Sequence, residues 1–108
     1  MSDEAQEGSG VIRERVLAAR KRQVERLRPF GMFCNAHMGH RAIRETCCVT
    51  EQARRLLQEV FDKFKLSARS YDRVIKVSRT IADLGESDEI GQEHVAEALS
   101  YRNKLQRM

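Results

Sequence analysis

The chain has 108 residues, one domain's worth of sequence, enough to bury a single modest core. Apolar residues make up 41 % and charged residues 33 % of it, with one proline and no tryptophan, which excludes a disordered chain and is typical of a helical domain. No apolar run approaches the roughly 20 residues of a membrane span. The acidic, polar N-terminus is unlike a signal peptide. We therefore expect a cytoplasmic protein that does not contact a membrane.

The cysteines and the charge pattern bear on disulfide bonds and on the kind of partner that the chain could bind. The chain has three cysteines, Cys34, Cys47 and Cys48, and the last two are adjacent. An odd number of cysteines with an adjacent pair is a poor basis for disulfide bonds, so we expect reduced thiols. The net charge of +4 is uneven: residues 11–30 carry seven Lys or Arg against two Glu, and residues 80–100 carry six acidic residues without Lys or Arg. Fifteen Arg against five Lys favour contacts with phosphate or carboxylate. This pattern fits nucleic acid and an acidic protein surface equally well.

The N-terminal third of the chain is predicted to be an arm, a long helix and a packed loop. Residues 1–9 are predicted to form a flexible acidic arm, and residues 10–105 the folded domain. A helix is predicted over residues 11–28 and ends at Pro29. It carries a narrow apolar stripe in a basic shell, formed by Ile12, Val16, Ala19, Gln23 and Leu27. The loop over residues 29–39 is expected to pack down through its apolar side chains, Phe30, Met32, Phe33 and Met38.

Four more helices follow. A short one is predicted over residues 40–47, and the next begins after Thr50 and has a broad apolar face that includes Phe61 and Phe64. A fourth, over residues 68–84, has Ser67 as its N-cap and Gly85 just past its end. The last covers residues 91–103. Because no stretch shows a period of two, the fold class is all-α, a small bundle of about five helices.

Motifs that would make the chain an enzyme on its own are missing from the sequence. It has no GxxxxGK[ST] phosphate loop, no GxGxxG, no HExxH, and no serine or cysteine in a nucleophile motif. We therefore expect no catalytic residue and no enzymatic activity of the isolated chain.

Four separated segments are very specific in their order and spacing. They are Arg13-Glu-Arg-Val16 with Ala19-Arg20 and Gln23, Asn35-Ala36, the stretch Leu66-Ser-Ala-Arg-Ser-Tyr-Asp-Arg-Val-Ile-Lys-Val-Ser-Arg-Thr-Ile-Ala-Asp-Leu84, and His94-Val-Ala-Glu-Ala-Leu-Ser-Tyr-Arg102. Together they resemble the C-terminal domain of the magnesium-chelatase-like, competence-related AAA+ ATPases, over residues 10–103.

The resemblance implies a helical lid that follows the nucleotide-binding core of a larger ATPase. The parent protein would form a ring, a hexamer, and would act on DNA, in branch migration during natural transformation, while relatives insert magnesium into porphyrin. ATP and Mg²⁺ would bind only in the full-length protein, and no cofactor is expected for this chain alone. Arg69, at the start of the fourth helix, takes the position of the sensor arginine that reaches the γ-phosphate of ATP.

Three residues follow Arg69 on the same helix face at steps of four, three and four: Arg73, Lys76 and Thr80. Arg73 is a weaker candidate for the same phosphate site. The alternative is a solvated face carrying Asp72–Lys76 and Arg79–Asp83 ion pairs, each worth about 0.2–0.5 kcal/mol.

Two further interpretations remain open. The seven basic residues of the first helix suggest nucleic-acid binding, although they lack interleaved aromatic residues, and a ring could use them between subunits. Cys34, His37, His40 and Cys47 or Cys48 are ligand types that zinc accepts, but their spacing is unusual and loop residues without metal are favoured. The alternative function is a stand-alone basic helical module that binds nucleic acid or protein.

Overall fold

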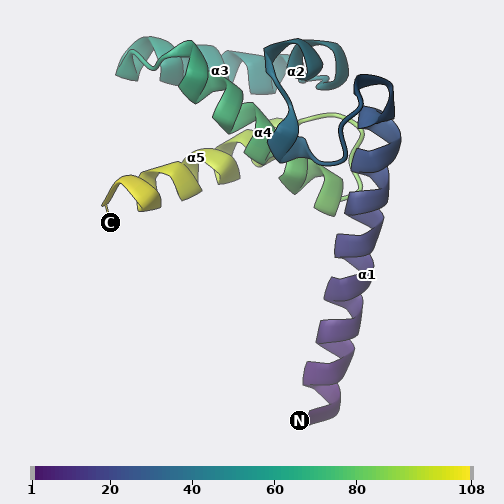
Figure 1. Cartoon of the computed structure of the whole chain (residues 1–108). Helices are drawn as coiled ribbons and strands as arrows, with labels where there is room; N and C mark the ends of the chain where they lie inside the picture. The colour runs from purple at the N-terminus through teal and green to yellow at the C-terminus, as the bar shows by residue number, and fades with distance from the viewer. Residues whose placement is uncertain (1, 108) are drawn as a thin grey trace.

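The computed structural model describes residues 2–107, and the side chains of residues 10–101. In this part the chain forms α1 (Ser2–Leu27), α2 (His40–Thr46), α3 (Glu51–Phe64), α4 (Ala68–Leu84) and α5 (Gln92–Arg107), with short 3-10 turns η1 (Arg28–Phe30) and η2 (Asn35–His37). The described residues contain no strand, which confirms the predicted all-α bundle (Figure 1). None of the described helices is long and apolar enough to cross a membrane.

The helices begin and end where capping chemistry predicts. The Thr50 hydroxyl accepts a hydrogen bond from the Ala53 amide at 3.2 Å, and the Ser67 hydroxyl accepts one from the Ser70 amide at 3.2 Å. Pro29 lies in η1 directly after α1 ends, and Gly31 takes a left-handed φ of 69° that reverses the chain at low cost. These local signals confirm the predicted order of helices.

The helix α1 begins earlier than the sequence predicts. Backbone of α1 begins at Ser2, within the segment predicted as an arm. The side chains of residues 1–9 lie outside the described residues, so the flexibility of the arm stays a prediction.

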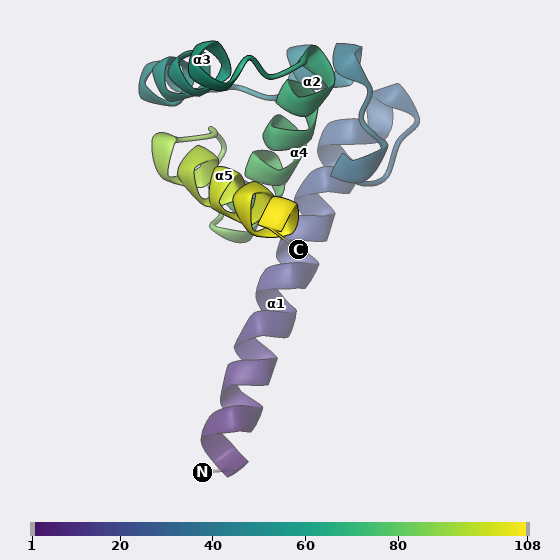
Figure 2. The ribbon, with the colours of Figure 1, turned by 90° about the vertical axis from the view of Figure 1, so that its left-hand side faces the viewer.

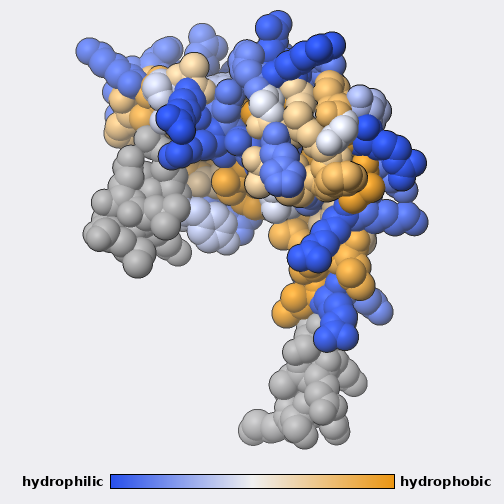
Figure 3. Space-filling view, viewed as in Figure 1, coloured by the Kyte–Doolittle hydropathy of each residue, from blue (hydrophilic) through white to orange (hydrophobic). Residues whose placement is uncertain are grey.

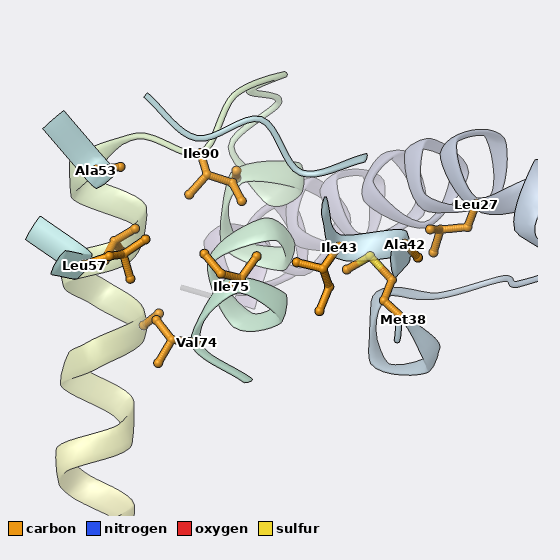
Figure 4. Packing of buried hydrophobic residues seen from close by; sticks show 12 residues of the cluster. Leu27, Met38, Ala42, Ile43, Ala53, Leu57, Val74, Ile75 and Ile90 are labelled. Carbon is orange, nitrogen blue, oxygen red and sulfur yellow. The ribbon is translucent and has the colours of Figure 1, made fainter. Parts of the chain in front are cut away.

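Helix α4 runs through the middle of the molecule and contacts α1, α2, η2 and α5. Its Val74 and Ile75 pack in one cluster with Leu57 of α3, Ile43 of α2 and Leu27 of α1 (Figure 4). Burying an apolar side chain of this size contributes about 1.5–3 kcal/mol. The core therefore forms around α4, whose two faces hold the other helices in place.

A single parallel bridge closes the bundle on the side of α3 and α5. Ile90, in the loop before α5, donates its amide to the Cys48 carbonyl at 2.8 Å and accepts from the Thr50 amide at 3.0 Å. Because the Ile90 side chain is fully buried, this bridge holds the α4–α5 loop against the start of α3.

The first half of α1 projects from the bundle. Figures 1 and 2 show it leaving the body while its C-terminal half lies against α4. Ala19, Gln23 and Leu27 of the predicted stripe are buried, but Ile12 is 60 % exposed. The predicted stripe is therefore buried only along its second half, because the bundle is too short to cover the whole helix.

Two aromatic side chains also depart from the prediction. Phe33, expected to pack down with its loop, and Phe64, expected in the core, are both exposed. Phe64 is the last residue of α3, and its ring centroid lies 5.7 Å from the Lys63 ammonium. Apolar periodicity alone does not tell where the neighbouring helix ends.

The most unusual feature of the core is a buried carboxylate, Asp83. It is 0 % exposed and accepts hydrogen bonds from both terminal nitrogens of Arg26, from Nε of Arg79 at 3.1 Å and from Nδ2 of Asn35 at 2.9 Å. These donors come from α1, η2 and α4. A buried charge is tolerated when it is paired and hydrogen-bonded in this way.

The same network extends to the turn before α5. Arg79, only 1 % exposed, donates to the Asp88 carbonyl at 2.8 Å and to the Ser87 carbonyl at 2.5 Å. Asn35 also receives a bond from Arg26, and its backbone amide donates to the buried Gln23 side chain. No buried side-chain nitrogen or oxygen among the described residues lacks a partner.

This arrangement corrects one sequence prediction. The alternative of a solvated face predicts an exposed Arg79–Asp83 ion pair; the pair forms, but both side chains are buried. Burial lowers the pKa of the Arg79 guanidinium, an effect that the Asp83 carboxylate opposes. The second expected pair is not formed, since Asp72 contacts His40 at 3.2 Å instead.

Replacing Asp83 by Asn tests the weight of this network. The substitution keeps the shape but leaves two buried or half-buried guanidinium groups without an anion, so we expect Asp83→Asn to lower the free energy of unfolding by about 3–5 kcal/mol. Asp88→Asn is the control, because it removes only the exposed pair with Arg22 and should cost at most about 1 kcal/mol. Urea unfolding of both variants gives the comparison, and equal losses would contradict the structural role of Asp83.

Candidate functional site

The two candidate arginines lie in the first two turns of α4. Arg69 is the second residue of the helix and Arg73 stands one turn further on, and both side chains are exposed. Neither makes a hydrogen bond or an ion pair with a described side chain. Both guanidinium groups are therefore available to a ligand outside this chain.

The start of α4 favours an anion near Arg69. The Ser67 hydroxyl caps the helix by accepting the Ser70 amide, and it also donates to the Ser70 hydroxyl at 3.2 Å. The helix is 17 residues long, so its N-terminal end carries a partial positive charge beside the fixed charge of Arg69. A guanidinium binds a phosphate or carboxylate through paired N–H groups. This end of α4 can accordingly bind one anionic group.

The rest of the predicted face serves the fold. Thr80 accepts a hydrogen bond from Asn35 Nδ2 at 3.0 Å and donates to the Lys76 carbonyl at 3.1 Å, at the edge of the buried Asp83 network. Lys76 is half-buried beside it. The face that the sequence predicts as continuous thus divides into an exposed half with two arginines and a half attached to η2.

The basic helix α1 is partly used within the domain. Arg22 pairs with Asp88 at 3.1 Å, and Arg26 binds the buried Asp83. The other five basic residues of the predicted helix are exposed: Arg13, Arg15, Arg20 and Lys21 on α1, and Arg28 in η1. They remain available to a partner, but without aromatic residues among them on α1.

The candidate zinc ligands take separate roles. His40 contacts Asp72, while the Cys47 thiol lies 4.0 Å from the Met38 sulfur and 3.8 Å from the Thr46 hydroxyl. Burial raises the pKa of the Cys47 thiol, which disfavours the thiolate that binds metal. Among the side chains described, no group of three or more His, Cys, Asp or Glu could hold a metal ion.

Sequence reasoning missed the importance of Asn35, Arg26 and Asp83. A signal for Asp83 was present, because Val74, Ile75, Ser78, Arg79, Ala82 and Asp83 follow one helical register and all are buried. Nothing in the local sequence indicated Arg26, which lies 57 residues away from Asp83.

Comparison with known proteins identifies the family. Residues 6–102 match the family described as magnesium chelatase, subunit ChlI C-terminal. Over 96 residues, which are 89 % of this chain, it is 41 % identical to competence protein ComM of Haemophilus influenzae and 38 % identical to the uncharacterized protein YifB of Escherichia coli. The chain spans only 18 % of the length of these relatives. No solved structure matches it. The chain belongs to the family of magnesium chelatase C-terminal domains and is similar to the C-terminal part of ComM-type proteins.

Proposed function

We propose that the chain acts as the C-terminal lid of a longer, magnesium-chelatase-like AAA+ ATPase. Two findings support this proposal. The chain belongs to the family, and the segment that matches it makes up only 18 % of the length of ComM. The chain itself has no phosphate loop. The preceding core of the same polypeptide would therefore bind ATP and Mg²⁺, and hydrolysis of the γ-phosphate would take place there.

The observation that carries the proposal is the exposed guanidinium of Arg69 in the first turn of α4. No described side chain pairs with it. Its role would be to bind the γ-phosphate, with Arg73 one turn away as a weaker second contact. After hydrolysis this partner is lost, so the position of Arg69 reports the state of the nucleotide. The chain then senses the reaction without carrying out its chemistry.

The opposite end of α4 would couple a movement of Arg69 to helix α1. Asp83 lies in the last turn of α4 and is held by Arg26 of α1, so a shift of Arg69 moves α4 and α1 together. Because α1 is the first helix of the chain, it is the element through which motion of the lid would reach the core. From the family resemblance we further propose a ring, a hexamer, in which nucleotide state alters the contacts between subunits.

The substrate follows from the relatives only as a proposal. One of them is named a competence protein, which is consistent with a ring motor that acts on DNA, in branch migration, and works in the cytoplasm.

Substitution of Arg69 in the longer protein tests the sensor role. We expect Arg69→Ala to lower ATP turnover about tenfold to a hundredfold, since one charge-assisted contact to the γ-phosphate is lost. Arg73→Ala should have a smaller effect. Arg44→Ala, an exposed arginine on α2, is the matched control and should leave turnover unchanged. Unchanged melting temperatures would show that the fold is intact, and an Arg69→Ala protein with normal turnover would refute the assignment.

The second candidate, a stand-alone nucleic-acid-binding module, is favoured by the five exposed basic residues of α1 and η1. It predicts that the isolated chain binds duplex DNA at about 50 mM salt and that affinity falls steeply as salt is raised. We expect no such binding, because α1 offers neither aromatic stacking nor a recognition helix. Fluorescence anisotropy with a labelled DNA duplex distinguishes the lid from the nucleic-acid-binding module. Salt-sensitive binding that Arg20→Ala weakens would favour the alternative.

A further inference from the structure

A groove of about 780 Å³ lies in the corner between α1, α4 and α5. Its walls are mainly apolar and come from three helices. They are Ile12 and Val16 of α1, Val77, Ile81 and Leu84 of α4, and Tyr101 of α5. Figure 3 shows apolar surface on the part of α1 that leaves the body. Figure 1 shows that α1 and α5 run in different directions away from α4.

The groove continues a face that is buried elsewhere. Ile12 and Val16 stand at helical spacing from Ala19 and Leu27, which pack against the bundle. The first half of this stripe has no such cover from the described residues, and Ile12 is 60 % exposed. Helices gain most of their stability from tertiary packing of an apolar face, and a continuous exposed apolar patch marks an interaction site.

Charges at the rim define what fits. Arg15 of α1 and Lys76 of α4 line the groove, and neither is paired with a described side chain. Glu97 lies on the α5 side, where it accepts a hydrogen bond from Tyr101 at 3.3 Å. A complementary occupant therefore has an apolar stripe with acidic residues toward α1 and α4 and a basic residue toward α5. An amphipathic helix has this form.

We propose that this groove is the docking site for an amphipathic helix from the nucleotide-binding part of the same polypeptide. The inference rests on the proposed function, in which this chain follows such a part. Two observations favour an occupant in the same chain over a separate protein. The curated relatives hold more than four fifths of their length outside the matched segment, and the groove borders the N-terminal half of α1, where the connection is shortest.

Hydrogen–deuterium exchange of the longer protein tests the docking. We expect the backbone amides of residues 11–18 and 94–101 to exchange about tenfold or more slowly in the longer protein than in the 108-residue chain, because an occupied groove slows local opening. Ile12→Glu should restore fast exchange in both segments. Leu17→Glu is the matched control: Leu17 lies on the same helix and is 56 % exposed, but does not line the groove. It should leave the protection intact.

Three outcomes would overturn the proposal. Equal exchange in the longer protein and in the 108-residue chain would mean that the groove stays uncovered. Equal effects of Ile12→Glu and Leu17→Glu would mean that helix α1, and not the groove, responds. Protection that disappears on about tenfold dilution would assign the groove to a second copy of the protein. The turnover of Arg69→Ala reports the sensor role separately: normal turnover together with a protected groove would reject that role and keep the docking site.

Discussion

The buried carboxylate of Asp83 is the constraint on which the arrangement of this domain depends. It lies fully buried among α1, η2 and α4 and is held by Arg26, Arg79 and Asn35. A buried charge that lost these partners would cost several kcal/mol, so the three elements must keep the positions from which their donors reach it. Apolar packing allows a range of helix angles, and the directional hydrogen bonds of this network narrow that range. The angle between α1 and α4 is therefore fixed by hydrogen-bond geometry as well as by the core.

The same network sets both surfaces that we assign to partners. Arg79 holds the carbonyls of Ser87 and Asp88, which fixes the turn that leads into α5. All three walls of the apolar groove are thus positioned around one ionic cluster. The start of α4 with Arg69 belongs to the same rigid helix. A ligand at Arg69 and a helix in the groove would act on one element, which gives a lid a physical route from nucleotide state to contacts with its neighbours.

Sequence predicted what is local and missed what is distant. The caps Thr50 and Ser67 and the break at Pro29 are read from neighbouring residues, and the structure confirms them. In the sequence, an Arg and an Asp four residues apart have the same pattern whether the pair is exposed or buried. The contact between Arg26 and Asp83 exists only in the folded chain. The position of Arg69 came from the family resemblance. The structure adds that its side chain is exposed, while the groove, made by three helices, has no sequence pattern of its own.

The central claim is that this domain is the lid of a longer ATPase, and the DNA upstream of the codon for Met1 in the source gene tests it most directly. The account predicts that the reading frame continues upstream through a GxxxxGK[ST] phosphate loop followed by an acidic strand that binds magnesium. A reading frame that starts at Met1, with no phosphate loop encoded before it, would contradict the account.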